Sequence, residues 1–227
     1  MCRGADQSSS GRCIIFSGFW QGSPPTPPLE ISHVDYKACA DGGYLICAAM
    51  GFEADIVIGD FDSLSADKIL EIESLGIEKA VFPCEKDDTD VMLCAKHGLA
   101  LGFDNFLILG GIGGDFAHTI ANLQTLSFLI DMGCKAEILT STEQILMLDG
   151  RAAGFSGCAG AKFSVFSYVE RSSGVYIENA KYPLSDVVLT NSSPIGAGNE
   201  FINTEPVTIS VRQGRLLVIV ELQRVLH

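Results

Sequence analysis

The chain has 227 residues, of which 47% are hydrophobic, and a formal net charge of −13 at pH 7. This length suits one large domain or two small ones, and the hydrophobic content supports a full core, which excludes global disorder. The acidic balance argues against a nucleic-acid partner, because such proteins carry a basic stripe. No apolar run reaches the roughly 20 residues of a membrane span, so we expect no membrane partner.

The first residues lack the charged start and long apolar block of a signal peptide, so we expect a cytoplasmic protein. The eight cysteines include no CxxC pair, which leaves zinc and thioredoxin-like chemistry poorly supported. Cys13, Cys47 and Cys94 stand in apolar runs, where free thiols behave as small hydrophobic groups. We therefore expect reduced cysteines within the core.

Strands and helices alternate along the first part of the chain. The expected strands cover residues 12–19, 36–40, 55–58, 80–82, 106–109 and 136–139. The expected helices cover residues 44–51, 66–75, 118–132 and a segment that runs from the acidic cluster at 85–90 to about residue 101. This alternation is typical of a mainly parallel sheet that is covered by helices on both faces.

Four prolines between Pro24 and Pro28 interrupt the pattern after the first strand. Proline lacks the backbone donor that a helix or a central strand needs, so this stretch must be an extended loop. It is either an ordinary surface loop or a flap over the neighbouring strand ends.

After about residue 145 the pattern changes to short segments rich in Val, Ile and Phe, separated by Gly, Ser and Pro. The segments are 143–149, 162–169, 174–178, 186–190, 206–212 and 215–222. They predict an antiparallel β domain, with Gln213-Gly214 as a hairpin turn. The expected fold is therefore α/β: a mainly parallel, Rossmann-like domain over residues 12–144, followed by an antiparallel β-sandwich domain over residues 145–227.

Carboxylates cluster after two of the expected strands. Asp60 and Asp62 follow the buried run at 55–58, where an uncompensated charge pair is costly. They converge on one ion if Phe61 turns away, although Gly and Asp are also ordinary turn residues. Asp87, Asp88 and Asp90 open the next helix and are either ligands or a solvated helix start. Hard oxygen ligands without a cysteine or histidine cluster point to magnesium.

Glycines follow two other strands and could bring backbone amides close to a phosphate. Asp41 is followed by Gly42 and Gly43, which fits a nucleotide contact or a tight turn. The run 110–114, GGIGG, leads into a helix start, which favours anions, but it is neither a P-loop nor GxGxxG. The helix then carries His118, a ligand or a structural histidine, and Asn122, a ligand contact or a surface amide.

These segments together resemble the thiamine pyrophosphokinase family, also called thiamine diphosphokinase. The matching segments, in chain order, are ADGG (40–43), GDFDS (59–63), DxTD (87–90), GGxGG with the following His and Asn (110–122), KYPL (181–184) and GNEF (198–201). Members transfer a pyrophosphoryl group from ATP to the hydroxyl of thiamine, giving thiamine diphosphate and AMP. The resemblance implies an α/β nucleotide domain, a β-sandwich and a homodimer whose thiamine site lies between the two subunits.

The resemblance also implies roles for individual residues. Its carboxylates imply a Mg²⁺ site on Asp60, Asp62 and Asp90, with Asp87 as a further catalytic residue of the cleft. The ATP contacts that it implies are Asp41, Gly42, Gly43, Gly113, Gly114, His118 and Asn122. For thiamine, it implies the turn at Gly198 and Asn199, and we add Lys86 to the substrate site.

The chain departs from the family pattern in the glycine loop. The family reads GGRxDH, whereas Asp115 stands here at the arginine and Ala117 at the aspartate. An arginine would pair with ATP phosphates, whereas an aspartate would repel them, and Lys86 or Arg151 would have to supply the charge. Gly198 replaces the serine of the family's turn. Two alternatives therefore stay open: an enzyme for another heterocyclic alcohol, or a weakly catalytic thiamine- or nucleotide-binding protein.

Overall fold

The computed structural model describes residues 11–22, 31–83, 87–157 and 159–222. Within it the chain forms two compact units, Met1–Ala136 and Glu137–His227. Lys86 and the stretch Pro24–Pro28 lie outside the described residues. The division at residue 144 into two domains stays a prediction, because compactness alone does not show that either part folds independently.

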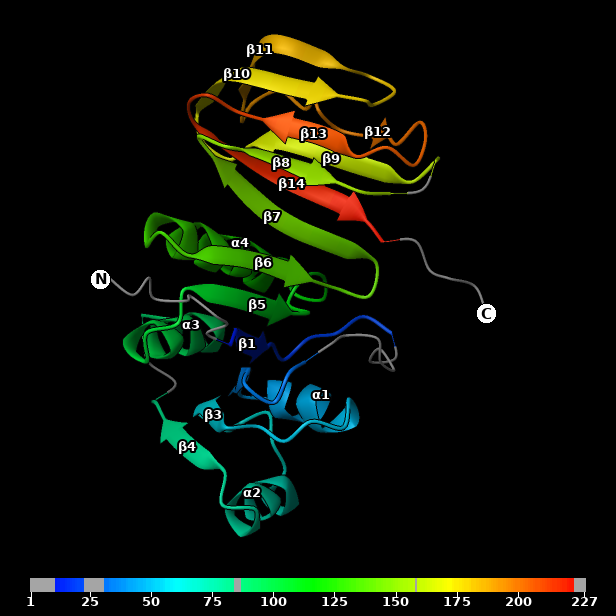
Figure 1. The fold of residues 1–227 in the computed structure, drawn as a ribbon. Coiled ribbons are helices and arrows are strands. Elements are labelled where there is room, and N and C mark those ends of the chain that lie inside the picture. The colour runs from blue at the N-terminus through cyan, green and yellow to red at the C-terminus, as the bar shows by residue number, and fades with distance from the viewer. Residues whose placement is uncertain (1–10, 23–30, 84–86, 158, 223–227) are drawn as a thin grey trace, which may run out of the picture. The chain divides into compact units, whose positions relative to one another are not determined.

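The first unit is an α/β layer with a parallel sheet whose strand order is β5-β1-β2-β3-β4 (Figure 1). Its strands are β1 (Cys13–Phe16), β2 (Tyr36–Ala40), β3 (Ile56–Gly59), β4 (Glu78–Val81) and β5 (Asn105–Leu109). Its helices are α1 (Gly43–Ala49), α2 (Ala66–Ser74), α3 (Asp90–Ala100) and α4 (Phe116–Asp131). Every residue of β1 and β3 is buried, as the uninterrupted apolar runs predict for strands covered on both faces.

Side-chain caps fix where two of the helices begin. Ser65 caps α2 by accepting a hydrogen bond from Lys68 N, and Thr89 caps α3 by accepting one from Met92 N. Left-handed glycines follow the C-terminal ends of the helices, at φ +69° for Gly76 after α2 and φ +80° for Gly133 after α4. The sequence therefore sets the helix limits through local chemistry.

The strand register gathers the loops of this unit at one edge. Phe16 at the end of β1 pairs with Cys39 of β2 and with Leu109 of β5. Ala40 at the end of β2 pairs with Ile58 of β3. Because the strands are parallel, the residues that follow each of them meet beyond the same carboxyl edge.

In the second unit, the strands in the order β12-β9-β14-β7-β6 are the antiparallel part of a mixed sheet. The strands in the order β11-β10-β13-β8 form a second, antiparallel sheet (Figure 1). The strands are β6 (Lys135–Leu139), which crosses the division between the units, β7 (Glu143–Asp149), β8 (Ala152–Phe155), β9 (Lys162–Ser167), β10 (Arg171–Glu178), β11 (Leu184–Thr190), β12 (Asn199–Glu200), β13 (Val207–Ser210) and β14 (Arg215–Glu221). Buried residues from both sheets form one hydrophobic cluster, in which the rings of Phe163 and Phe201 lie 5.1 Å apart.

Three local expectations need correction. Gln213-Gly214 is not a hairpin turn, because β13 belongs to one sheet and β14 to the other. The first strand ends at Phe16, three residues before the expected end, and the next three residues line the cavity described below. Strands β8 and β12 were not expected, because one contains Ala-Ala-Gly and the other is only two residues long.

Two compositional expectations can be compared with the described residues. Five cysteines lie in them, at positions 13, 39, 47, 94 and 134, and all five are buried thiols that form no disulfide, as expected. Burial raises the pKa of the Cys13 thiol to about 12, so this thiol stays protonated at neutral pH. Among the described residues, no helix combines the length and apolarity that crossing a membrane requires.

Candidate functional site

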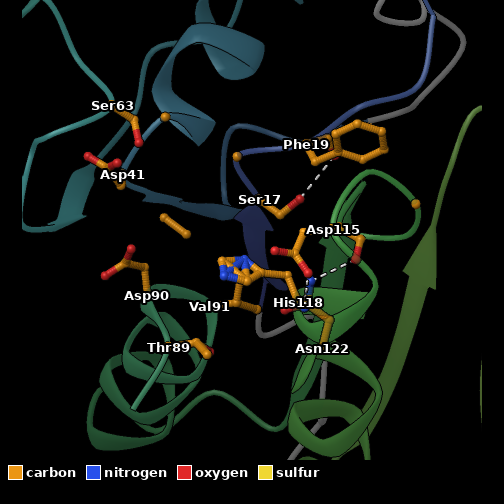
Figure 2. Close-up of a pocket in the computed structure, with 15 residues that line it drawn as sticks. Ser17, Phe19, Asp41, Ser63, Thr89, Asp90, Val91, Asp115, His118 and Asn122 are labelled. Atoms are coloured by element: carbon orange, nitrogen blue, oxygen red, sulfur yellow. Dashed lines mark hydrogen bonds between the residues drawn. The ribbon is translucent and has the colours of Figure 1, made fainter. Parts of the chain in front are cut away.

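A cavity of about 320 Å³ opens at the carboxyl edge of the first unit's sheet (Figure 2). Ser17, Gly18 and Phe19 follow β1, and Ala40, Asp41 and Gly42 lie at the end of β2. The remaining described lining comes from Ser63, the start of α3 (Thr89, Asp90, Val91), the glycine loop (Gly111, Gly113) and the start of α4 (Asp115, His118, Asn122). The cavity therefore lies where the topology gathers the strand ends.

Asp41 is a buried carboxylate of the cavity. Its side chain lines the cavity although the residue is only 5% exposed, and its Oδ1 has no hydrogen-bond partner. Its backbone is left-handed, at φ 44°, and its N–H donates to Ile58 O. Gly59 makes room for it, because a Cβ at Gly59 would lie 2.8 Å from the Asp41 Cβ. A buried, partly unsatisfied carboxylate is costly unless a cation compensates it.

Asp60 and Asp62 lie close to Asp41. Phe61, between them, adopts φ 65°, the turn away that convergence of the two aspartates requires. Asp60 Oδ1 accepts from Asp62 N, and Asp62 Oδ1 accepts from Ser63 Oγ. One carboxylate oxygen from each of Asp41, Asp60 and Asp62 lies within 4.8 Å of the other two.

This carboxylate triad, Asp41, Asp60 and Asp62, fits a magnesium ion. Oxygens bound to one octahedral Mg²⁺ lie about 3 to 4 Å apart, and the oxygens here lie within 4.8 Å of one another. The donors are hard oxygens, and the unsatisfied Oδ1 of Asp41 is available to the ion. The residues present therefore fit the group, and Asp41, which the sequence suggested as a nucleotide contact, is a member of the triad.

The acidic residues before α3 are divided by the fold. Asp90 lines the cavity, but it is outside the carboxylate triad. Asp87 is exposed, and Asp88 is held by Lys96, whose Nζ lies 2.7 Å from its Oδ2. Neither Asp87 nor Asp88 is part of the described cavity lining. Lys86 belongs to the undescribed residues.

The glycine loop packs against Phe19 and is fixed by side chains of α4. Gly111 N donates to Phe19 O, and Asn122 Nδ2 donates to Gly111 O at 2.7 Å. Gly113 N donates to Thr119 Oγ1. A Cβ at Gly114 would lie 2.8 Å from the Phe19 ring, so only glycine fits there. Asn122 is only 5% exposed. It is therefore a buried amide that holds the glycine loop, and not an amide on the helix surface.

Asp115 caps α4 with its own carboxylate. Its Oδ1 accepts from Ala117 N at 2.7 Å and from His118 N at 3.4 Å. Figure 2 shows Asp115 on one side of the cavity and Asp41 with Asp90 on the other, with the His118 ring between them. Among the described lining residues no lysine or arginine is present, so aspartates provide the charge that faces the cavity.

The two glycines after Asp41 serve close packing. A Cβ at Gly43 would lie 2.0 Å from Phe16 O, so no side chain fits at the start of α1. A Cβ at Gly42 would touch the Ser63 side chain at 3.4 Å, and Gly42 lines the cavity. The pair thus allows α1 to begin directly against the end of β1.

In the second unit, Asn199 organises the turn at Gly198. The Asn199 amide is 4% exposed, accepts from Tyr182 N and Glu200 N, and donates to Tyr182 O. Gly198 N donates to Ser164 Oγ. Asn199 therefore fixes the backbone of Tyr182 and Glu200, while the Tyr182 side chain stays largely exposed.

Sequence reasoning missed several lining residues, namely Ser17, Gly18 and Phe19 after β1, together with Ser63 and Thr89. The first three fall within the strand expected over residues 12–19, which extends the apolar run through Phe19. The Ser-Gly step was the available signal, since a polar residue and a glycine after four apolar residues mark the end of a buried strand.

Comparison with known proteins gives consistent matches. A model of the thiamin pyrophosphokinase catalytic domain matches residues 28–138, and one of the thiamin pyrophosphokinase vitamin B1 binding domain matches residues 156–216. A thiamine pyrophosphokinase of Bacillus subtilis is 26% identical over 162 residues, which is 71% of this chain and 75% of that protein.

Solved structures of thiamine pyrophosphokinases share the fold. A crystal structure from Bacillus subtilis matches with a TM-score of 0.81 at 23% identity, over 92% of this chain and 99% of that one. The structure from Candida albicans matches with a TM-score of 0.75 at 14% identity, over 94% of this chain and 90% of that one.

Proposed function

Because the chain belongs to the thiamine pyrophosphokinase family, we propose that it transfers the pyrophosphoryl group of ATP to the hydroxyl of thiamine at the cavity of its first unit. The products are thiamine diphosphate and AMP. The unsatisfied Oδ1 of Asp41, buried beside Asp60 and Asp62 at this cavity, carries the proposal. Such a carboxylate is maintained at a cost to stability, which is typical of a site that binds a cation.

In the proposed reaction the thiamine oxygen forms a bond to the β-phosphorus of ATP. The bond from that phosphorus to the oxygen of the α-phosphate breaks, and AMP leaves with the electron pair. The hydroxyl proton passes to solvent. Transfers of this kind depend mainly on positioning and charge neutralisation, so a strong base is not required. Asp90 faces the cavity from α3, and Asp87 is retained as a catalytic residue on the resemblance alone.

Mg²⁺ is the proposed metal, held by Asp41, Asp60 and Asp62, and Asp90 faces the cavity from α3 as a further ligand. Bound there, it offsets the phosphate charge of ATP. The protein groups then orient the nucleotide: Gly42, Gly43, Gly113 and Gly114 leave space, while His118 and Asn122 border the cavity. This division of roles lets a strongly acidic chain bind an anionic substrate.

On the thiamine side, the proposed contacts are Lys86 and the turn at Gly198 and Asn199. We propose that the protein is a cytoplasmic homodimer in which this turn completes the site of the other subunit. The first unit then acts as a Rossmann-like nucleotide domain, and the second as a β-sandwich, which its shared core between two antiparallel sheets supports.

Product analysis with matched variants tests the proposal. Wild-type protein, MgATP and thiamine should give thiamine diphosphate, whereas the double variant Asp60→Asn/Asp62→Asn should lose at least about 10³ in turnover while staying folded. The matched control Asp67→Asn removes a carboxylate at the start of α2, outside the cavity lining, and should keep normal turnover. A folded double variant with normal turnover would refute the metal site.

A further inference from the structure

We infer that Asp115 is a specificity-determining residue, which excludes the anionic part of a ligand from the α4 end of the cavity and confines it to the carboxylate triad. This inference rests on the proposed nucleotide-dependent function. Beyond that function, the inference states on which side of the cavity the polyphosphate lies, and it names Asp115 as the residue that determines this position.

Asp115 occupies the donors that an anion would use. The start of a helix attracts anions because its first amides have no partner within the helix. Here the Asp115 carboxylate accepts from two of these amides, those of Ala117 and His118. A phosphate at this place would have to displace the carboxylate or lie against it.

The rest of the described lining does not compensate this charge. Asp41 and Asp90 face the same cavity, and no lysine or arginine is among its described lining residues. The unsatisfied Oδ1 of Asp41 marks the opposite side as the place where a cation binds. The cavity is therefore polarised: phosphate can be held through a metal beside Asp41, whereas the Asp115 end suits a neutral or cationic group, such as an uncharged heteroaromatic ring.

The capping role and the charge of Asp115 can be separated by substitution. Asparagine caps helices about as well as aspartate, so Asp115→Asn keeps the hydrogen bonds and removes only the charge. The control Asp67→Asn removes the same charge from the first turn of α2, outside the described cavity lining. Both variants change the net charge equally, so a long-range effect of net charge would alter both alike.

The experiment measures the affinity of the full-length protein for adenosine, AMP, ADP and ATP by titration calorimetry. Titrations are made with EDTA and, for AMP and ADP, also with Mg²⁺. We expect Asp115→Asn to bind metal-free ATP about threefold to tenfold more tightly than wild type, because screened Coulomb repulsion between the carboxylate and the phosphates is removed. The gain should fall from ATP to AMP, vanish for adenosine, and shrink with added salt. Asp67→Asn should match wild type.

Two results would overturn the inference. Equal nucleotide affinity of wild type and Asp115→Asn would show that the carboxylate does not exclude phosphate. An equal gain for adenosine would show a change of shape instead of charge. Either result leaves the proposed function intact if wild type still forms thiamine diphosphate, whereas failure of both proteins to bind any adenine nucleotide would contradict the proposed function as well.

Discussion

At the scale of single residues, Asp41 combines features that each lower stability. Its carboxylate is buried, one oxygen has no hydrogen-bond partner, and two further aspartates lie within 4.8 Å. Its backbone is also left-handed, which aspartate tolerates better than most residues. These costs are concentrated at the cavity, and the proposed Mg²⁺ would offset them, whereas structural packing alone would favour an uncharged side chain.

We expect Asp41→Asn to raise the unfolding free energy of the metal-free protein by about 1–2 kcal/mol, because it removes like-charge repulsion inside the triad. Asparagine also tolerates the left-handed backbone. Mg²⁺ should raise the melting temperature of the wild type by several degrees but leave that of the variant unchanged. Thermal unfolding with Mg²⁺ or EDTA measures both effects, with Asp67→Asn as the control. A Mg²⁺ response that survives in Asp41→Asn would contradict the metal site.

Asp35 illustrates a different use of a buried carboxylate. Burial alone would raise its pKa, but hydrogen bonds from the Arg12 side chain, from Arg12 N and from Ser32 N hold the pKa below the ordinary value of 3.8. A carboxyl group whose folded-state pKa is lowered stabilises the fold above its unfolded pKa. That contribution is lost as the pH falls through the folded-state pKa.

Asp35→Asn should therefore lower the unfolding free energy by about 1.5–3 kcal/mol at pH 7, the range for charged hydrogen bonds. The difference in unfolding free energy between wild type and Asp35→Asn should stay constant above about pH 5 and shrink as the pH falls below about 4. Urea unfolding across this pH range measures it. A difference that grows toward acid pH would show that the sign of the pKa shift is wrong.

Some of these residues could be recognised from sequence and others could not. Asp60 and Asp62 are visible because they follow a buried run, but their association with Asp41 depends on which strands are neighbours. The charge of Asp115 suggested repulsion of phosphate, whereas its cap follows from a local rule: aspartate is preferred directly before a helix. Predicting the helix start at residue 116 rather than 118 would have revealed it.

At the scale of elements, the glycine loop after β5 is shaped by contact with Phe19. Gly110, Gly111, Gly113 and Gly114 all have positive φ, and the aromatic ring packs on the last two. The loop is thus held between the segment after β1 and the start of α4. Its glycines are needed for space as well as for backbone conformation.

Gly110→Ala separates these two requirements when it is compared with Gly133→Ala. Both glycines are left-handed, but a Cβ at Gly110 would lie 2.2 Å from Phe19 O, whereas a Cβ at Gly133 would meet nothing within 4 Å. We expect Gly133→Ala to cost about 1 kcal/mol of unfolding free energy and Gly110→Ala at least about 2 kcal/mol more. Chemical denaturation measures both values. Equal losses of unfolding free energy in the two variants would mean that the backbone at Phe19 moves away from the added methyl group at little cost.

Regular elements were predictable where local pattern and tertiary context agree. The apolar runs of β1 and β3 and the capped starts of α2 and α3 follow from local chemistry. The sheet assignment of β13 and β14 does not, because alternating side chains cannot show which strand lies alongside. Gln213-Gly214 therefore looked like a hairpin although the chain passes there from one sheet to the other.

At the scale of the whole molecule, the net charge of −13 and an anionic nucleotide substrate have to be reconciled. The proposed Mg²⁺ at the carboxylate triad would do this locally, and Asp115, in the role inferred for it, would then limit where phosphate can lie. Composition indicated an acidic protein and the alternation of strands and helices indicated the α/β class, but neither could locate the cavity, which depends on parallel strand order. The family resemblance supplied the substrate, which no cavity of this size identifies by itself.

Mixed dimers test the proposed site between subunits. One chain would carry Asp60→Asn/Asp62→Asn and the other Asn199→Ala, each inactive alone. Random mixing by co-expression should restore about a quarter of the wild-type turnover, because half of the dimers then contain one intact site. Circular dichroism checks that each variant is folded. No recovery in purified mixed dimers would place the whole site within one subunit.

The most direct test of the account is AMP formation by the purified protein from MgATP, with and without thiamine. The account predicts AMP and thiamine diphosphate in equal amounts, only when thiamine is present, and no product after EDTA is added. ADP in place of AMP, or AMP formation that is independent of thiamine, would contradict pyrophosphoryl transfer to thiamine as the reaction of this protein.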